Sequence, residues 1–388
     1  MQNTPGNGST SQPNAGPTAQ LTTAERARYA RHLTLPGFGE QAQRRLKAGR
    51  VLVVGAGGLG SPVALYLAAA GVGTIGLVDF DRVDETNLQR QVLYGTSDVG
   101  RPKLDAARER LLDLNPHVNI VLHEARLDRD NALEVIAGYD VVADGTDNFP
   151  TRYLVNDACV LTGTPNVYAS IHQFEAQVSV FATEGGPCYR CLYPEPPAPG
   201  MVPSCAEGGV LGVLPGLAGT IQATEVLKLL AGVGETLVGR LLRIDALTMQ
   251  TRTLRLSRDP DCPVCGDEPT ITELIDYEAF CGVGPADDLD EMTPAQLRAR
   301  LAGDDPPALV LDVREVSEYD AYNIGGHLIP LGQLGDRLGE LVAYKNQEVL
   351  VHCKAGSRSA RAARLLKDAG FTNVVNLAGG LDALQARI

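Results

Sequence analysis

A glycine-rich turn between a strand and a helix is the feature that most restricts the fold of this chain. Residues 50–54 form a short apolar run, residues 55–60 read Gly-Ala-Gly-Gly-Leu-Gly, and residues 61–70 favour a helix. A second apolar run, residues 74–78, ends at Asp79. A strand, helix, strand unit of this kind implies parallel pairing and a right-handed crossover. The sequence therefore predicts an α/β fold with a Rossmann-like sheet.

The same turn predicts a nucleotide site. Gly55, Gly57 and Gly60 make a Gly-x-Gly-x-x-Gly pattern directly before a helix, where backbone N–H groups and the helix dipole can receive phosphate. Asp79, at the end of the next strand, is placed to accept hydrogen bonds from ribose hydroxyls. On these residues alone, a NAD-binding fold fits as well as an ATP-binding one.

Further polar side chains favour a triphosphate. Donors and cations follow the second strand, namely Asn87, Gln89, Arg90 and Lys103. After the apolar run of residues 139–143 come Asp144, Asp147 and Asn148, whose oxygens suit magnesium. A triphosphate with magnesium needs such groups more than a dinucleotide does, so the sequence predicts ATP and magnesium as cofactors.

Length and charge restrict the class of protein. The 388 residues can bury two cores. The net charge of −13 argues against nucleic acid as a partner, because such binding depends on Lys and Arg that neutralise phosphates. No apolar run approaches a membrane span, and the N-terminus lacks a basic region before an apolar core. We therefore expect a cytoplasmic globular protein that does not bind membranes.

Composition along the chain predicts its domain organisation. The four expected segments are a disordered tail (1–20), a larger α/β domain (21–270), a linker (271–290) and a smaller α/β domain (291–388). The tail contains almost no large apolar side chains, so its sequence cannot offset the entropy of ordering. In the last segment, two strand-like runs are followed by a helix at residues 359–369 that stops at Gly370.

Four of the eight cysteines predict a metal site. They form two Cys-x-x-Cys motifs, one at Cys188 and Cys191 and the other at Cys262 and Cys265. Two such motifs in a reducing compartment indicate a structural zinc ion held by four thiolates. Two separate redox pairs remain the alternative. Cys159 is expected in the core, and Cys281 has no predicted role.

Cys353 is the candidate nucleophile of the last segment. It ends an apolar run and opens the sequence Cys-Lys-Ala-Gly-Ser-Arg, which comprises Cys353, Lys354, Ala355, Gly356, Ser357 and Arg358. A helix is expected to begin directly after this loop. Loop N–H groups, the helix N-terminus and the two cations would all stabilise a thiolate or persulfide anion.

The first domain resembles a known family. Its motifs, in order, are Gly-Ala-Gly-Gly-Leu-Gly, Asp-Phe-Asp, Asn-Leu-Gln-Arg-Gln, Gly-Arg-Pro-Lys and Thr-Asp-Asn. Over about residues 21–265 they resemble the ThiF/MoeB family, the bacterial relatives of ubiquitin-activating enzymes. This resemblance implies that a protein carboxyl terminus is activated with ATP as an acyl-adenylate.

The resemblance also implies roles for single residues. Asp79 would hold the ribose, Arg90 and Lys103 the phosphates, and Asp147 the magnesium ion. Other expected nucleotide contacts are Gly55, Gly57, Gly58, Gly60, Asn87, Leu88, Gln89 and Asn148. Arg31 would reach the ATP site of the partner in a homodimer. Cys205 would attack the adenylate or form a disulfide with the incoming sulfur; a loop cysteine without function is the alternative.

The last segment resembles the rhodanese domain over residues 293–388, on the Cys353 loop and on Leu-Asp-Val-Arg-Glu at residues 311–315. The fusion resembles MoeZ-type adenylyltransferase/sulfurtransferases. It implies a ubiquitin-like sulfur carrier protein of the MoaD, ThiS or CysO type, with a cysteine desulfurase or thiosulfate as sulfur donor. Molybdenum cofactor biosynthesis is the expected pathway, and thiamine, cysteine or tRNA thiolation are alternatives. A NAD-dependent oxidoreductase and a non-catalytic scaffold are the other classes considered.

Overall fold

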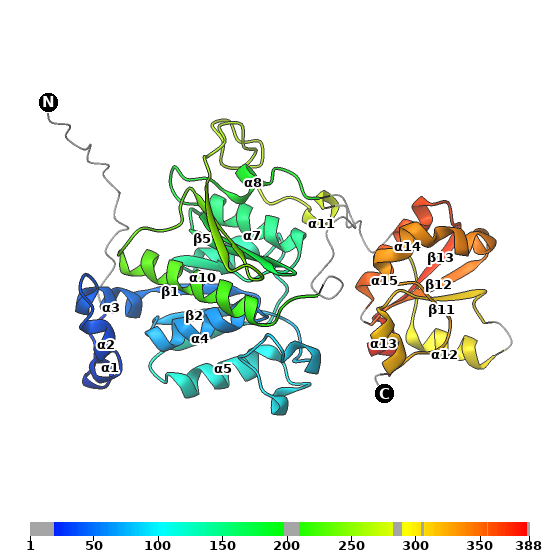
Figure 1. The fold of residues 1–388 in the computed structure, drawn as a ribbon, viewed down its shortest axis with the longest axis horizontal. Helices are drawn as coiled ribbons and strands as arrows, with labels where there is room; N and C mark the ends of the chain where they lie inside the picture. The colour runs from blue at the N-terminus through cyan, green and yellow to red at the C-terminus, as the bar shows by residue number, and fades with distance from the viewer. Residues whose placement is uncertain (1–18, 198–208, 282–288, 304–305, 355, 386–388) are drawn as a thin grey trace. The chain divides into compact units, whose positions relative to one another are not determined.

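The computed structural model describes residues 19–197, 209–281, 289–303, 306–354 and 356–385. The chain divides into two compact units, with the division between Tyr277 and Glu278. Each unit is a β-sheet flanked by helices (Figure 1). Among the described residues, no helix combines the length and apolar character that crossing a membrane requires.

The first unit contains an eight-stranded sheet in the order β3-β2-β1-β4-β5-β6-β7-β8. Its strands are β1 (Arg50–Val54), β2 (Thr74–Val78), β3 (Asn119–His123), β4 (Val141–Asp144), β5 (Asn166–His172), β6 (Glu175–Phe181), β7 (Arg240–Asp245) and β8 (Gln250–Arg255). Strands β3 to β5 in this order pair in parallel, and β5 to β8 pair antiparallel. The strand order reverses between β1 and β4, which is where α/β sheets bind ligands.

The helices of the first unit are α1 (Thr23–Arg28), α2 (Ala30–Leu33), α3 (Gly39–Ala48), α4 (Gly60–Ala70), α5 (Lys103–Leu114), α6 (Ala132–Ala137), α7 (Phe149–Thr162), α8 (Tyr189–Leu192) and α10 (Val213–Ala231). Helix α11 (Tyr277–Phe280) spans the division between the two units. Helices α4 and α10 pack on each other and share the main core with the central strands. The predicted unit of strand, turn, helix and strand agrees with β1, α4 and β2.

The second unit contains a five-stranded parallel sheet in the order β11-β10-β12-β13-β9. Its strands are β9 (Asp290–Met292), β10 (Leu309–Asp312), β11 (His327–Leu328), β12 (Glu348–His352) and β13 (Asn373–Leu377). Its helices are α12 (Pro294–Ala302), α13 (Val316–Ala321), α14 (Leu331–Arg337), α15 (Ser357–Asp368) and α16 (Gly380–Gln385). Because β12 ends at His352, Cys353 lies at the carboxyl edge of the sheet.

The interval predicted as a linker, residues 271–290, is partly packed. Tyr277 is buried, and its hydroxyl donates a hydrogen bond of 2.9 Å to Asp157 Oδ2 in the first unit. Cys281 is also buried. The chain is therefore fixed to the first unit at least as far as Tyr277.

Candidate functional site

The glycine turn joins β1 to α4, and two of its glycines are required by the backbone. Gly55 has a φ of +88°, a conformation that disfavours residues with a side chain. A Cβ atom on Gly60 would lie 1.9 Å from the carbonyl oxygen of Gly55. Gly57 and Gly58 are less crowded, with Cβ contacts of 3.6 Å and 3.3 Å respectively. The turn is thus held close to the first turn of α4, where N–H groups can meet a phosphate.

Asp79 and Lys103 lie together beside this turn. The two carboxylate oxygens of Asp79 accept hydrogen bonds of 2.8 Å from the backbone N–H groups of Ala56 and Asp81. Lys103 is buried at the start of α5, and its Nζ lies 2.8 Å from Asp81 Oδ2 and 4.0 Å from Asp79 Oδ2. The structure therefore brings a carboxylate and an ammonium group to one edge of the sheet, as the sequence predicts.

The segment after β2 adds further polar groups. Asn87, Leu88 and Arg90 are half-buried and Gln89 is exposed. The Nη1 atom of Arg90 donates a hydrogen bond of 3.1 Å to the carbonyl oxygen of Thr86. This bond holds one side of the Arg90 guanidinium in place. The other N–H groups of the guanidinium can then donate to a ligand.

Sequence reasoning missed Tyr94, which supports the turn. Its hydroxyl donates a hydrogen bond of 2.8 Å to the carbonyl oxygen of Ala56. Burial, aided by the nearby carboxylate of Asp79, raises the pKa of Tyr94, so the hydroxyl stays a donor. A single tyrosine outside the recognised motifs carries no signal of this role.

The loop of residues 144–148 is also placed by local hydrogen bonds. Asp144 is fully buried at the end of β4, and its Oδ1 accepts bonds from the backbone N–H (2.9 Å) and hydroxyl (2.6 Å) of Thr146. Burial raises the pKa of Asp144. Asn148 accepts a bond of 2.9 Å from the N–H of Thr151 and so caps α7. Asp147 is exposed, and no hydrogen bond or ion pair engages it within the described part of the chain. Of the predicted oxygen ligands, Asp147 is therefore the best placed to hold a cation.

Two further residues, Arg31 and Cys205, were predicted to act at the site of the first unit. Arg31 is exposed on α2, which packs against α1 and α3. Its predicted contact with a partner subunit stays a prediction. Cys205 lies outside the described residues.

The two Cys-x-x-Cys motifs meet in a single cluster. The sulfur atoms of Cys188, Cys191, Cys262 and Cys265 all lie within 4.8 Å of one another. The shortest separations join the two motifs, with 3.6 Å from Cys188 to Cys262 and 3.4 Å from Cys191 to Cys265. Within the first motif the separation is 4.0 Å. Four thiolates at about 2.3 Å from a tetrahedral ion would lie about 3.8 Å apart, so these residues fit a zinc ion better than two redox pairs.

In the second unit, Cys353 begins the loop between β12 and α15. Its sulfur accepts hydrogen bonds from the N–H of Gly356 at 3.1 Å and from the hydroxyl of Ser359 at 3.4 Å. Gly356 has a φ of +93°, which suits a residue without a side chain. These donors would stabilise negative charge on the sulfur. Ser359 was not predicted, and Ala355 and the side chain of Ser357 lie outside what the structure describes.

The two cations of this loop have different surroundings. Lys354 is half-buried. The guanidinium of Arg358 pairs with Glu318 through contacts of 2.6 Å and 2.8 Å, and its stabilisation of the persulfide stays a prediction. Burial opposes charge on Glu318, yet Arg358 lowers the pKa of its carboxyl group. The Arg358 charge is therefore largely neutralised within the protein.

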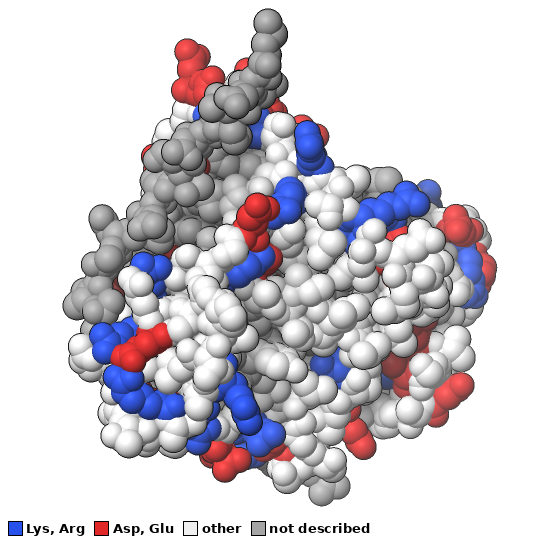
Figure 2. All heavy atoms as spheres, turned by 60° about the vertical axis from the view of Figure 1, so that its left-hand side comes forward, with Lys and Arg blue, Asp and Glu red and all other residues white. Residues whose placement is uncertain are grey.

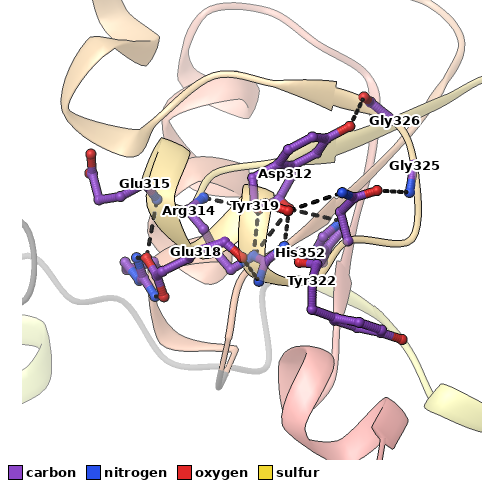
Figure 3. Close-up of polar contacts among 11 residues, drawn as sticks. Asp312, Arg314, Glu315, Glu318, Tyr319, Tyr322, Gly325, Gly326 and His352 are labelled. Carbon is purple, nitrogen blue, oxygen red and sulfur yellow. Dashed lines mark hydrogen bonds and ion pairs between the residues drawn. The ribbon is translucent and has the colours of Figure 1, made fainter. Parts of the chain in front are cut away.

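A buried network supports the Glu318 segment. Figure 3 shows Arg314 between Asp312 and Glu318. Arg314 donates to both carboxylate oxygens of Asp312, at 2.6 Å to Oδ2 and 3.0 Å to Oδ1. It also donates to the carbonyl oxygens of Glu318 and Tyr322. The network thus fixes α13 to the carboxyl end of β10, beside the start of the Cys353 loop.

His352 makes the second unit sensitive to pH. It is fully buried, and neither ring nitrogen has a hydrogen-bond partner among the described residues. Burial, opposed by Asp312 at 3.9 Å, lowers the pKa of His352 from 6.5 to about 4. The unfolded chain therefore binds more protons than the folded chain between these values, so stability present above pH 6.5 is lost as the pH falls towards 4.

We expect a loss of up to about 3 kcal/mol at the acid end of this window, at about 1.4 kcal/mol per pKa unit. The measurement is the urea midpoint for deuterium exchange in peptides that cover β12, taken at several pH values. His352→Leu should flatten the pH dependence, because no buried imidazole then needs to be protonated. His327 is half-buried and lies 3.1 Å from Glu340; changed to alanine, it is the control and should keep the slope. An equal slope in His352→Leu would contradict the assignment.

Comparison with known proteins finds a family match for each of the two units. The profile described as the ThiF family matches residues 29–264, and that of the rhodanese-like domain matches residues 293–387. The chain belongs to the ThiF family. The ThiF match spans the glycine turn, Asp79 and three of the four clustered cysteines, and the rhodanese-like match spans the Cys353 loop.

Several relatives of this ThiF-family chain share both units. The probable adenylyltransferase/sulfurtransferase MoeZ of Mycobacterium tuberculosis is 51% identical and covers 95% of this chain and 94% of that protein. The adenylyltransferase and sulfurtransferase MOCS3 of Mus musculus is 45% identical, covering 97% and 88% respectively. The sulfur carrier protein adenylyltransferase of Thermus thermophilus is 57% identical but covers 68% of this chain and 98% of its own length. The predicted α/β fold and adenylyltransferase/sulfurtransferase type are thereby confirmed.

A solved structure shares the fold of part of this chain. The crystal structure of E. coli MccB with MccA-N7isoASN has a TM-score of 0.57 and 24% sequence identity. It covers 64% of this chain and 76% of that one. At this identity the likeness concerns the fold alone.

Proposed function

We propose that this chain adenylates the C-terminal glycine of a ubiquitin-like sulfur carrier protein and then converts it to a thiocarboxylate. The chain is an adenylyltransferase and sulfurtransferase. The observation that carries the proposal is the presence in one chain of two sites: a glycine turn that meets Asp79 and Lys103, and Cys353 in a loop whose donors face its sulfur. Each site suits one half of the reaction.

The first half-reaction is adenylation. A carboxylate oxygen of the carrier attacks the α-phosphorus of ATP, the bond to the β-phosphate breaks, and pyrophosphate leaves. Positioning and neutralisation of charge are the main requirements. Asp79 would bind the ribose and Lys103 and Arg90 the phosphates, and the present pairing of Lys103 with Asp81 would be exchanged for phosphate oxygen.

Two metal ions belong to this proposal. Asp147, free of internal partners among the described residues, would hold magnesium, which neutralises phosphate charge when bound. The four-cysteine cluster would hold zinc in a closed structural site. The zinc would contribute to folding of the first unit and would not take part in the chemistry.

The second half-reaction transfers sulfur. The Cys353 thiolate attacks the outer sulfur of a donor and forms a persulfide. Sulfite leaves when the donor is thiosulfate, and the cysteine thiolate of a desulfurase leaves when the donor is its persulfide. The terminal sulfur attacks the acyl-adenylate carbonyl, AMP leaves, and an acyl disulfide forms. A thiol must then attack this disulfide to release the thiocarboxylate, and Cys205 is our candidate. The resulting disulfide requires an external thiol reductant for the next turnover.

A homodimer is part of the proposal. Figure 2 shows one side of the molecule, where Lys and Arg lie among Asp and Glu and leave a broad uncharged area. Apolar side chains of α4, of α10 and of the segment after β2 are exposed in the first unit, with exposed fractions of 54% for Tyr66, 59% for Val92 and 69% for Val213. Tyr66 and Val92 line one hollow together with Leu65 and Gly216, and exposed apolar surface of this kind is typical of a protein interface. Arg31 would act at the partner's ATP site.

We assign the activity to the cytoplasm and, in the first instance, to molybdenum cofactor biosynthesis. Thiamine, cysteine and tRNA thiolation share the same carrier activation. The names of the relatives MoeZ and MOCS3 support an adenylyltransferase/sulfurtransferase in each case. The carrier that is modified decides between these pathways.

The test is the intact mass of candidate carriers after incubation with the full chain, ATP, magnesium, thiosulfate and a thiol reductant. We expect replacement of one carboxylate oxygen by sulfur, and no change when ATP is omitted. A carrier lacking its terminal glycine is the matched control and should stay unmodified. If ATP–pyrophosphate exchange is not stimulated by any carrier, the adenylation proposal is wrong.

A further inference from the structure

The residues between the first two cysteines are attached to the helix that begins at the Asp147 loop. Tyr189 and Arg190 separate Cys188 from Cys191, and both are almost fully buried against α7. The N–H of Tyr189 donates a hydrogen bond of 2.7 Å to the side chain of Asn156. The cysteine cluster is therefore connected to α7 through the two residues between Cys188 and Cys191.

A buried ion pair reinforces this attachment. Arg190 donates to both carboxylate oxygens of Asp157, at 2.9 Å and 2.8 Å, and these two side chains are exposed by only 1% and 0%. The Arg190 guanidinium also lies 4.8 Å from the centre of the Tyr153 ring. Breaking a buried pair of this kind is strongly destabilising, so the contact between the cysteine motif and α7 is costly to separate.

Arg152 continues the connection to the Asp147 loop. Its side chain is buried in the first turn of α7, and Nη2 donates a hydrogen bond of 3.0 Å to the carbonyl oxygen of Thr146. The guanidinium carbon lies 5.4 Å from the ring centre of Tyr168 and 6.0 Å from that of Tyr189. Burial opposes its charge, but Tyr168, Tyr189 and Asp144 together raise the pKa of Arg152.

This charge is not fully satisfied. The Nε atom of Arg152 and the Oδ2 atom of Asp144 are both buried without a hydrogen-bond partner among the described residues. The cation is thus held by the rings of Tyr168 and Tyr189, by the carbonyl oxygen of Thr146 and by the nearby carboxyl group of Asp144. Tyr189 lies inside the cysteine motif, so a displacement of the motif would also displace the Tyr189 ring. Because the Arg152 guanidinium lies over this ring, its position would change as well.

We propose that Arg152 is a positioning residue that couples the cysteine cluster to the Asp147 loop, so that the order of the cluster sets the affinity for magnesium-bound ATP. The inference rests on the proposed adenylation function. Tyr189 is the contact on the cluster side, and the carbonyl of Thr146 is the contact on the loop side.

The experiment measures ATP binding by the full chain by calorimetry over a range of magnesium concentrations. Arg152→Lys keeps the charge but loses the planar fork and its stacking, and Tyr189→Leu removes an aromatic wall but keeps all four cysteines. Both should bind ATP like the wild type without added magnesium, yet need about threefold to tenfold more magnesium for half-maximal enhancement of binding. Zinc content should stay that of the wild type.

Tyr153→Phe is the matched control. It lies on the same helix and loses one hydrogen bond to a backbone carbonyl, that of Tyr193 at 3.0 Å, but it does not touch the loop contact. Its magnesium dependence should be unchanged. A purely structural role of Arg152 would lower the melting temperature without changing the magnesium dependence, and that result would overturn the proposal.

A second measurement covers the case in which the variants fail to fold. Coupling is reciprocal, so magnesium-bound ATP should slow the loss of zinc from the wild-type chain to a zinc-selective chelator. Equal release with and without nucleotide would overturn the coupling. If the wild type binds no ATP at any magnesium concentration, the adenylation proposal itself fails. Normal ATP binding with unchanged zinc release would reject the coupling alone.

Discussion

Cys353→Ala is expected to abolish thiocarboxylate formation while carrier-dependent ATP–pyrophosphate exchange stays at the wild-type rate. Alanine cannot carry a persulfide, and Cys353 is the residue whose sulfur receives the N–H of Gly356 and the hydroxyl of Ser359. The exchange reaction uses groups of the other unit and needs no sulfur. The loss should therefore affect one half-reaction completely and leave the other unchanged.

The measurement is the intact mass of the carrier together with the exchange rate on the same sample. Cys159→Ala is the matched control, because Cys159 is a buried cysteine of α7 that we assign to packing. That variant should retain both half-reactions. Undiminished thiocarboxylate formation by Cys353→Ala would mean that another cysteine carries the sulfur.

Ser359 explains why the loop was only partly predictable. The motif from Cys353 to Arg358 is continuous in sequence, so backbone donors close to the sulfur could be expected from it. Ser359 follows one residue later, and only the first turn of α15 brings its hydroxyl to the sulfur. The pairing of Arg358 with Glu318 joins residues separated by 40 positions, and a local motif contains no information about such a contact.

In the first unit, too, features set by the local sequence were predictable and contacts set by the fold were not. The segments β1, α4 and β2 were predictable because the hydrophobic periodicity, the glycine positions and the strand ends are all local properties of the sequence. The loop of residues 144–148 was predicted as a set of magnesium ligands, yet Asp144 turns inward to Thr146 and Asn148 caps α7. Asp and Asn serve as turn and cap residues as readily as ligands, and only the fold separates these roles.

The cysteine cluster shows how spacing can specify a tertiary contact. Two Cys-x-x-Cys motifs predicted one four-thiolate site, and the sulfur atoms do converge. The sequence could not indicate that Tyr189 and Arg190, between the first two ligands, would bind α7. Their partners Asn156 and Asp157 lie 33 positions away, in a helix whose own pattern suggests only packing.

Asp147→Ala should lower carrier-dependent pyrophosphate exchange by about a hundredfold or more, the size of effect seen when one preorganised charge-stabilising group is removed. Asp147 is the predicted magnesium ligand that has no internal partner among the described residues, so the substitution removes an oxygen without breaking a described contact. We therefore expect the melting temperature to change little. A NAD-dependent oxidoreductase or a non-catalytic scaffold would not require this carboxylate.

The comparison that decides the role of Asp147 is with its neighbour Asn148 and with a remote carboxylate. Asn148→Ala removes the cap of α7, so it should lower stability by about 1 kcal/mol and reduce exchange less than Asp147→Ala does. Asp113→Ala, at an exposed position on α5, should change neither. Added magnesium should partly restore exchange in Asp147→Asn, because an amide oxygen is a weaker ligand than a carboxylate. Normal exchange in Asp147→Ala would place the magnesium ion on other groups, and an equal loss in Asp113→Ala would indicate a general effect of charge.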